Sequence, residues 1–304
     1  MQNRLLSSLL VAAAFGAVLV AVLPALAQEP PPAAGQAPAA APGGRGGRGG
    51  RGGFGRGMNL PPPGPTPHTA DGHPDMSGYW NAGNNGGAVF EVQKHPARSQ
   101  SLPAGNGAIV DPPDGLIPYQ PWAAEKAKDN FEHHLADEPE LHCYESGLPN
   151  QMYRQFGFQI LEPGGYVVMN WEFMHAVRII PTDNRPHVLP PSKKLFQGDS
   201  VGHWEGDTLV VDTIGFNGQT WLDTEPERLT SDALHVVERF SRPDFEHINY
   251  EVTVSDPKMY TKPWTNTRVF VLMKPGQELL EYSCEENNKE ISEGHVSDAL
   301  TQKK

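Results

Sequence analysis

Residues 201–223 of the chain read VGHWEGDTLVVDTIGFNGQTWLD, and this stretch decides the fold class. Glu205-Gly206-Asp207 has the composition of a tight turn, in which Gly206 is free to adopt a positive φ. The segment that follows, Thr208–Ile214, is rich in β-branched and apolar residues, as expected of a half-buried strand. The stretch therefore predicts a hairpin of two antiparallel strands.

Short strands separated by turn residues continue on both sides of this hairpin. Glu246–Val254 alternates polar with apolar side chains at a period of two, which is typical of a strand with one buried face. The links between strands are short, and short links require antiparallel neighbours. The expected strands are Tyr153–Leu161, Tyr166–Ile180, the hairpin Phe196–Phe216, Leu234–Phe240, Glu246–Val254, Trp264–Met273 and Leu279–Cys284. The predicted fold class is mainly β, an antiparallel meander that closes or nearly closes into a lipocalin-like barrel.

One segment, Pro121–Leu135, has the pattern of a short helix. Proline suits the first turn of a helix, and the apolar residues of the segment recur every four positions. The side chains of His133, His134, His142 and Cys143 lie close together in the sequence at its end. Their spacing matches no standard zinc pattern, so neither a metal site nor another cofactor is predicted.

The first 67 residues have the composition of a signal peptide and a linker. Met1–Arg4 is basic, Leu5–Leu23 is apolar, and Ala25-Leu26-Ala27 fits a signal-peptidase site, so residues 1–27 are predicted to be removed on export. The alternative is an uncleaved membrane anchor, because the apolar run is nearly long enough to span a bilayer. Residues 28–67, rich in Pro, Ala, Gly and Arg, are predicted to be a disordered linker. Residues 68–304 then form a single β domain in a periplasmic or secreted protein that is not integral to the membrane.

The charge of the β domain argues against nucleic acid as a partner. Residues 1–67 hold five of the 24 basic residues and one of the 36 acidic residues, so residues 68–304 carry 19 basic and 35 acidic residues, a net charge of −16. A domain this acidic repels phosphate backbones. The Arg-Gly repeats of residues 43–57 would suggest RNA binding in a cytosolic protein, but the export signal favours a basic tether.

The chain has two cysteines, Cys143 and Cys284, far apart in the sequence. In an oxidising compartment two lone cysteines most often pair, so a disulfide between them is predicted. Two free buried thiols and a metal–thiolate pair are the alternatives.

Several short motifs resemble one family. They are Ala70-Asp71-Gly72-His73-Pro74-Asp75 with Ser77-Gly78-Tyr79-Trp80, Trp204-Glu205-Gly206-Asp207-Thr208-Leu209-Val210-Val211, and Asp256-Pro257 with Thr261-Lys262-Pro263-Trp264. The chain resembles, over about residues 69–288, a large family of uncharacterised exported bacterial proteins. Gly78-x-Trp80 is also similar to the Gly-x-Trp of the lipocalins, in which the tryptophan closes one end of a barrel. The resemblance to the exported family implies export, and it implies no activity.

Candidate catalytic residues are polar side chains on apolar strand faces. If Tyr166–Ile180 is one regular strand, His175 shares a face with apolar residues, and Glu238 lies among apolar neighbours on Leu234–Phe240. Burial there would lower the pKa of a histidine and raise that of a glutamate, toward the range useful for proton transfer. The alternative is a structural role, with Glu238 paired to Arg178, Arg239 or Arg268. The candidate catalytic residues are His175, Glu238, Glu172, Arg178 and His235.

The aromatic residues Trp171, Trp204, Trp264 and Tyr260 are candidates for the lining of a ligand cavity. No nucleophile elbow, phosphate loop, dinucleotide fingerprint, haem-attachment or zincin motif occurs in the sequence. This favours an exported barrel that binds a small apolar or aromatic molecule. Two alternatives stay open: an enzyme without nucleotide cofactor that performs acid–base chemistry as an isomerase, lyase or hydrolase in the barrel cavity, and a structural or adhesion protein of the envelope.

Overall fold

The computed structural model describes residues 64–81, 92–94, 105, 107–154, 156–222, 229–286 and 288. The chain divides into two compact units, Met1–Met58 and Asn59–Lys304, and all described residues belong to the second. The predicted signal peptide and residues 28–63 of the predicted linker lie outside the described residues. Gly64–Pro67 are described and contact the domain, because the Phe245 amide donates to the Gly64 carbonyl at 2.9 Å.

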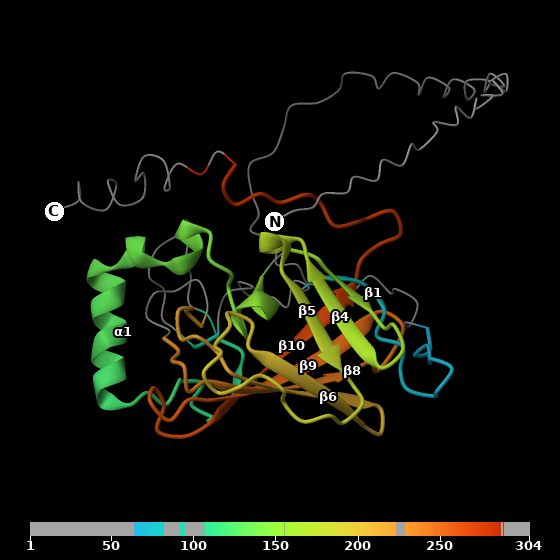
Figure 1. The fold of residues 1–304 in the computed structure, drawn as a ribbon, viewed down its shortest axis with the longest axis horizontal. Coiled ribbons are helices and arrows are strands. Elements are labelled where there is room, and N and C mark those ends of the chain that lie inside the picture. Colours follow the sequence, from blue (N-terminus) through green and yellow to red (C-terminus); the bar gives the residue numbers. More distant parts are fainter. Residues whose placement is uncertain are drawn as a thin grey trace, which may run out of the picture. The chain divides into compact units, whose positions relative to one another are not determined.

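The described residues form an antiparallel sheet that nearly closes into a barrel, as predicted (Figure 1). Its strands follow the order β5-β4-β3-β1-β10-β9-β8-β7-β6, β2 pairs with β10, and the end strands β5 and β6 lie side by side. The strands are β1 (Gly78–Asn81), β2 (Ile109–Asp111), β3 (Phe158–Leu161), β4 (Tyr166–Trp171), β5 (Val177–Pro181), β6 (Asp199–Glu205), β7 (Thr208–Ile214), β8 (His235–Ser241), β9 (His247–Ser255) and β10 (Trp264–Leu272). β1 joins two runs of hairpin-connected strands, β3–β5 and β6–β10.

The helix predicted from Pro121 is confirmed as α1, Pro121–His133, beside the barrel (Figure 1). Its proline occupies the first turn, and Ala123 and Ala127 form a buried face while Trp122 is exposed. The remaining helical segments are single 3₁₀ turns: η1 (Leu135–Asp137), η2 (Pro139–His142), η3 (Asn150–Tyr153) and η4 (Phe173–His175). Within the described residues no helix has both the length and the apolar composition needed to cross a bilayer.

The hairpin in residues 201–223 is confirmed as β6 and β7. Glu205 pairs with Thr208, which leaves Gly206 and Asp207 as the loop, and Gly206 has a φ of 59°. A positive φ of this size is readily adopted by glycine because it has no Cβ atom. Leu209 and Val211 point into the barrel and are almost fully buried.

The prediction of one long strand over Tyr166–Ile180 is wrong. The chain turns back at η4, where Met174 and His175 have positive φ, so that the amide of Trp171 donates to the carbonyl of Ala176 at 2.9 Å. A straight strand of this length would span about 50 Å, far more than one strand of a small barrel needs. Because of this turn, Arg178 and Ile180 face inward and Val177 and Ile179 face outward, the opposite of what one continuous strand would give.

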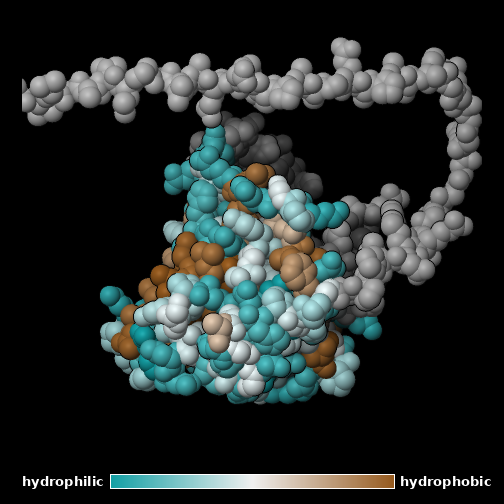
Figure 2. All heavy atoms as spheres, turned by 90° about the vertical axis from the view of Figure 1, so that its right-hand side faces the viewer, coloured by the Kyte–Doolittle hydropathy of each residue, from teal (hydrophilic) through white to brown (hydrophobic). Residues whose placement is uncertain are grey.

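On β5 a charged residue lies inside the barrel and apolar residues lie outside. Arg178 is 3 % exposed, whereas Val177 and Ile179 are 53 % and 61 % exposed. Figure 2 shows one face of the domain, on which apolar patches interrupt a mostly hydrophilic surface. The inward position of Arg178 is therefore not set by hydrophobicity, and its interior partners explain it.

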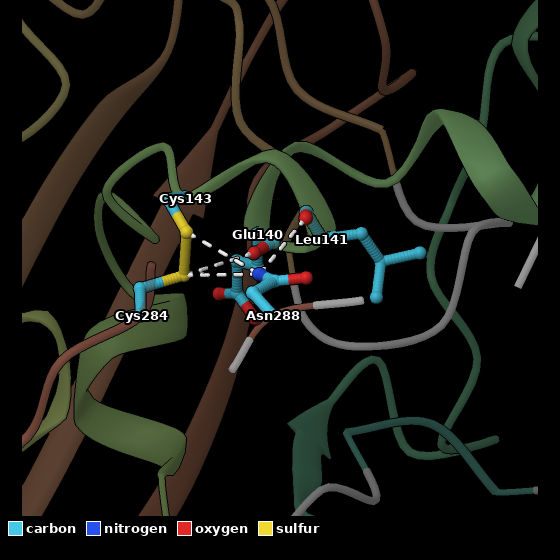
Figure 3. Close-up of a disulfide and its surroundings, with 5 residues drawn as sticks. All are labelled: Glu140, Leu141, Cys143, Cys284 and Asn288. Atoms are coloured by element: carbon cyan, nitrogen blue, oxygen red, sulfur yellow. Dashed lines mark hydrogen bonds between the residues drawn. A yellow bond between two sulfur atoms is a disulfide. The ribbon is translucent and has the colours of Figure 1, made fainter. Parts of the chain in front are cut away.

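The segment Leu279–Cys284 was expected to be a strand, and it is not. Its amides donate to side chains instead of to a neighbouring strand: Leu280 to Glu172 at 2.9 Å and Tyr282 to His175 at 3.1 Å. It ends at the disulfide between Cys143 and Cys284, which confirms the predicted pairing (Figure 3). The disulfide ties this segment to the end of η2.

Candidate functional site

The inward face of the barrel carries a buried ion pair between β5 and β8. Arg178 Nη2 lies 2.5 Å from Glu238 Oε2, and the two side chains are 2 % and 0 % exposed. Arg178 Nε donates to Ser200 at 2.9 Å and its Nη2 to Thr213 at 2.8 Å. The hydroxyl of Tyr250 donates to Glu238 Oε1 at 3.0 Å. Of the three arginines that were possible partners of Glu238 by sequence, Arg178 is the one that pairs with it.

This cluster links the two end strands of the sheet, because Arg178 belongs to β5 and its partners belong to β6, β7 and β8. Burial raises the pKa of the Tyr250 hydroxyl well above its usual value, and the charge of Glu238 adds to the effect. Tyr250 is therefore a hydrogen-bond donor to Glu238 throughout the physiological pH range. The two other candidate partners lie elsewhere: Arg239 faces outward and donates to Glu205 at 2.8 Å, and Arg268 stacks over the ring of Tyr153 at 4.3 Å.

A second feature of the interior is a set of buried polar atoms without a hydrogen-bond partner among the described residues. They are Trp171 Nε1, Trp264 Nε1, Arg178 Nη1 and Asn266 Oδ1. The Asn266 amide nitrogen donates to the hydroxyl of Tyr153 at 2.7 Å, so only its oxygen lacks a partner. Glu238, Val252 and Asn266 lie directly opposite one another on β8, β9 and β10, which places Asn266 on the same row as the ion pair.

Aromatic rings form a continuous wall along the same interior. The ring of Trp171 contacts Phe158 at 6.0 Å between centroids, and Phe158 contacts Phe270 at 5.0 Å. Phe270 contacts Tyr250 at 5.3 Å, and Tyr250 contacts Phe240 at 5.1 Å. The wall thus runs from Trp171 on β4 to Phe240 on β8, and it includes Tyr250, whose hydroxyl donates to Glu238. All of these rings belong to the hydrophobic core of the domain, so the interior places a few polar groups against packed apolar rings.

The structure does not bring His175 and Glu238 together. His175 lies in η4, is exposed, and accepts the Tyr282 amide, while Glu172 beside it accepts the Leu280 amide. The expectation that His175 shares an apolar strand face is therefore wrong. The strand ends before η4, and the side chain of His175 lies outside the barrel. His235 also faces away from the interior, with its Nε2 2.6 Å from Asp212 Oδ2.

Two of the four aromatic candidates lie inside the barrel, and the ring of Tyr260 packs against one of them, Trp264, at 5.9 Å between centroids. Trp171 and Trp264 lie inside the barrel, at 1 % and 0 % exposure. Trp204 is partly exposed and stacks on His73 at 4.5 Å between ring centroids. Tyr260 is buried outside the strands, where its hydroxyl donates to the carbonyl of Leu229 at 2.8 Å.

Sequence reasoning missed Asn266, Ser200 and Thr213. Asn266 shares a strand face with Trp264 and Phe270, so a polar residue on an apolar face was the available signal, as it was for Glu238. Ser200 and Thr213 carry no such signal, because serine and threonine are common on half-buried strands.

The histidines near the end of α1 pair with acidic neighbours. His133 contacts Asp129 at 3.2 Å and His134 contacts Asp137 at 2.8 Å, and Cys143 is consumed in the disulfide. Among the described residues no group of three or more His, Cys, Asp or Glu side chains has an arrangement that could hold a metal ion.

The strand order and the interior together define an antiparallel, nearly closed barrel with a buried polar cluster beside an aromatic wall. A comparison with models of known protein families and with curated proteins finds no match for this chain.

Proposed function

We propose that the protein is an exported barrel that binds a small aromatic molecule with polar substituents in its interior. The observation that carries this proposal is the set of buried, unpartnered polar atoms on the inward face of the strands. An unsatisfied buried donor or acceptor costs about 1–3 kcal/mol, so native proteins rarely keep several on one face without a use for them.

The chemistry of these atoms suggests the class of ligand. Trp171, Trp264 and Arg178 offer N–H donors, while Asn266 offers one carbonyl acceptor. A ligand with carbonyl, carboxylate or phenol oxygens would accept from the donors, and a hydroxyl or amine would donate to Asn266. The aromatic wall from Trp171 to Phe240 favours a flat ring, because offset aromatic contacts add to the burial of apolar surface.

Binding is favoured over acid–base catalysis inside the barrel. The catalytic alternative needed His175 next to Glu238, but His175 is exposed in η4 and Glu238 is paired with Arg178. Both carboxylate oxygens of Glu238 already accept hydrogen bonds, from Arg178 and from Tyr250, so this pair is better suited to fixing the barrel and, through Arg178 Nη1, to orienting a ligand than to moving protons.

Trp264→Phe tests the proposal, with Trp80→Phe as a matched control. Both tryptophans are fully buried, but Trp80 Nε1 donates to the Met76 carbonyl at 3.0 Å, whereas Trp264 Nε1 has no partner among the described residues. The two variants lose the same volume, and only Trp80→Phe also loses a satisfied hydrogen bond. We expect Trp80→Phe to be the less stable by about 1 kcal/mol.

Affinity should rank the two variants in the opposite order. A molecule that copurifies with the exported protein, identified by native mass spectrometry and titrated back by tryptophan fluorescence, should bind Trp264→Phe about tenfold more weakly than the wild type, since a buried hydrogen bond is lost. Its affinity for Trp80→Phe should be nearly unchanged. Equal affinities for both variants would count against a ligand at the unpartnered atoms.

Export is part of the same proposal. The disulfide between Cys143 and Cys284 supports an oxidising compartment, since such bonds are rare where thiols are kept reduced. Residues 1–27 supply the predicted signal. Replacing Ala25 and Ala27 by bulky residues should leave an unprocessed precursor in the cell, detected by its higher mass, while normal processing of that variant would exclude the predicted cleavage site.

A further inference from the structure

A groove of about 290 Å³ lies on the outside of the barrel, between the loop before β6 and the ends of β7 and β8. Its walls are mostly apolar, formed by Leu189, Pro190, Pro191, Ile214, Ala233 and Leu234. Its polar lining consists of Asp199, Lys193, Lys194, Asp232 and His235. A groove that combines apolar walls with several polar groups has the composition of a small-molecule site.

His235 is the last member of a chain of four titratable side chains. Its Nε2 lies 2.6 Å from Asp212 Oδ2, and Asp212 Oδ1 lies 2.7 Å from Nε2 of His187. His187 Nδ1 lies 3.2 Å from Asp199 Oδ2, and that oxygen also accepts from the amides of Val188 at 3.2 Å and Leu189 at 3.4 Å. The chain therefore runs from the loop wall of the groove, through Asp212, to the histidine that lines it.

Asp212 fixes which nitrogen of His235 is available. Partial burial works to raise the pKa of Asp212, but hydrogen bonds from His235 and His187 outweigh it and hold that pKa below its usual value. An ionised carboxylate only accepts, so the proton of neutral His235 sits on Nε2 and the lone pair on Nδ1. The His235 side chain is 42 % exposed, and a histidine held by a carboxylate in this way is the arrangement of a general base.

The groove is lined by two lysines, Lys193 and Lys194, and by two carboxylates, Asp199 and Asp232. Lys194 Nζ donates to the carbonyl of Asp232 at 3.1 Å, and the Asp232 carboxylate pairs with Lys258 at 2.5 Å. Lys193 is also exposed at the rim. Both carboxylates of the lining already have partners, Asp199 in His187 and Asp232 in Lys258. The ammonium groups of Lys193 and Lys194 are therefore the charges that the groove offers to a ligand, which favours an anionic one.

We propose that this groove is a second site, distinct from the barrel interior, that binds a small organic carboxylate and transfers one of its protons through His235. The substrate carboxylate lies at Lys193 and Lys194, and a C–H next to a carbonyl faces His235 Nδ1. The proton moves to Nδ1, and the electron pair of the broken C–H bond moves onto the carbonyl oxygen as an enolate. Return of the proton to another atom of the same substrate completes an isomerisation that needs no further reactant. His235 is the catalytic residue, and Asp212 and His187 position it.

Bromoacetate is the probe. It is a small carboxylate whose CH₂ carbon accepts the Nδ1 lone pair while the C–Br bond breaks and bromide leaves. No free cysteine competes in the described residues, because Cys143 and Cys284 are paired. His203 is the internal control: its side chain is 40 % exposed and its Nε2 lies 3.2 Å from Glu205, but it does not line the groove.

We expect bromoacetate to modify His235 at least about tenfold faster than His203, with a rate that saturates with reagent concentration, as measured by peptide mass spectrometry. Neutral bromoacetamide should show a much smaller preference. If bromoacetate modifies His235 no faster than His203, or if both reagents show the same preference, the carboxylate site does not exist. This comparison is made within the wild-type protein, so it does not depend on the folding of any variant.

Substitutions of the two lysines test the binding of the carboxylate, and a substitution of Asp212 tests the positioning of His235. Lys193→Gln and Lys194→Gln should reduce the preference for bromoacetate over bromoacetamide at His235 and leave the bromoacetamide rate unchanged. Asp212→Asn should slow both reagents equally, by about tenfold or more, because an amide favours the wrong imidazole tautomer. An Asp212→Asn variant that keeps the wild-type melting temperature and the wild-type rate would remove Asp212 from the mechanism. None of these residues faces the barrel interior, so failure here and failure of the barrel proposal are separate outcomes.

Discussion

Glu162 follows β3, where its Oε2 accepts the Met76 amide at 2.7 Å beside the carboxylate of Asp75. Burial raises the pKa of Glu162 to about 7, and the neighbouring Asp75 adds to the shift. Between the unfolded value of 4.5 and 7 the folded protein therefore binds a proton that the unfolded chain does not. By linkage, stability falls as pH rises through this window, by roughly 1–2 kcal/mol after allowing for partial exposure.

Glu162→Gln should remove this pH dependence, because glutamine still accepts the Met76 amide and never ionises. We expect the variant to be about 1 kcal/mol more stable than the wild type at pH 8 and similar to it at pH 5. Urea unfolding at the two pH values measures the difference. If the free energy of unfolding of the variant changes with pH as steeply as that of the wild type, a group other than Glu162 titrates.

The charges of Arg178 and Glu238 are both buried, so each needs the other as its counter-ion. Glu238→Gln leaves the Arg178 charge buried without its counter-ion, and removal of one partner of a buried pair costs about 3–5 kcal/mol. Arg178→Met/Glu238→Gln removes both charges and keeps an acceptor for the Tyr250 hydroxyl. The double variant should therefore be clearly more stable than Glu238→Gln alone, as measured by guanidinium unfolding. Strictly additive losses would mean that the pair is not coupled.

At the scale of elements, the segment Leu279–Cys284 is held by side chains and a disulfide instead of a strand ladder. Glu172→Ala and His175→Asn remove the acceptors for the Leu280 and Tyr282 amides, and asparagine tolerates the positive φ of position 175. Each amide should exchange its hydrogen about fivefold faster, since such a bond is worth about 1 kcal/mol.

The loss of protection from hydrogen exchange should stay local, because the Cys143–Cys284 disulfide still anchors the segment. The amide of Met273, which donates to the Tyr79 carbonyl at 2.8 Å, is the control and should exchange as in the wild type. Hydrogen exchange followed by mass spectrometry resolves the two regions. Unchanged exchange at Leu280 and Tyr282 would show that these bonds do not protect the segment.

At the scale of the whole molecule, the sequence predicted what depends on neighbouring residues and missed what depends on closure of the barrel. Alternation and turn composition were sufficient for the β6–β7 hairpin, and proline at the first turn was sufficient for α1. The reversal of β5 was not predictable, because Arg178 points inward only where Glu238, 60 residues later, meets it. The link from His187 through Asp212 to His235 likewise joins a loop and two strands that only the closed fold brings together.

Truncation of the chain can locate the beginning of the folded domain. Residues 28–63 have no apolar periodicity, and the compact unit begins at Asn59. A protein that begins at Asn59 should therefore melt within about 2 °C of the full chain.

A protein that begins at His68 loses three hydrogen bonds within the domain: from the Phe245 amide to the Gly64 carbonyl, from the Thr66 hydroxyl to the Arg242 carbonyl, and from the Asp75 amide to the Pro67 carbonyl. Its melting temperature should fall by several degrees, since about 2 kcal/mol shifts a domain of this size by roughly 4–8 °C. Calorimetry of the two truncations decides the boundary: equal melting temperatures place it at His68, and a large loss already at Asn59 would show that residues 28–58 stabilise the barrel.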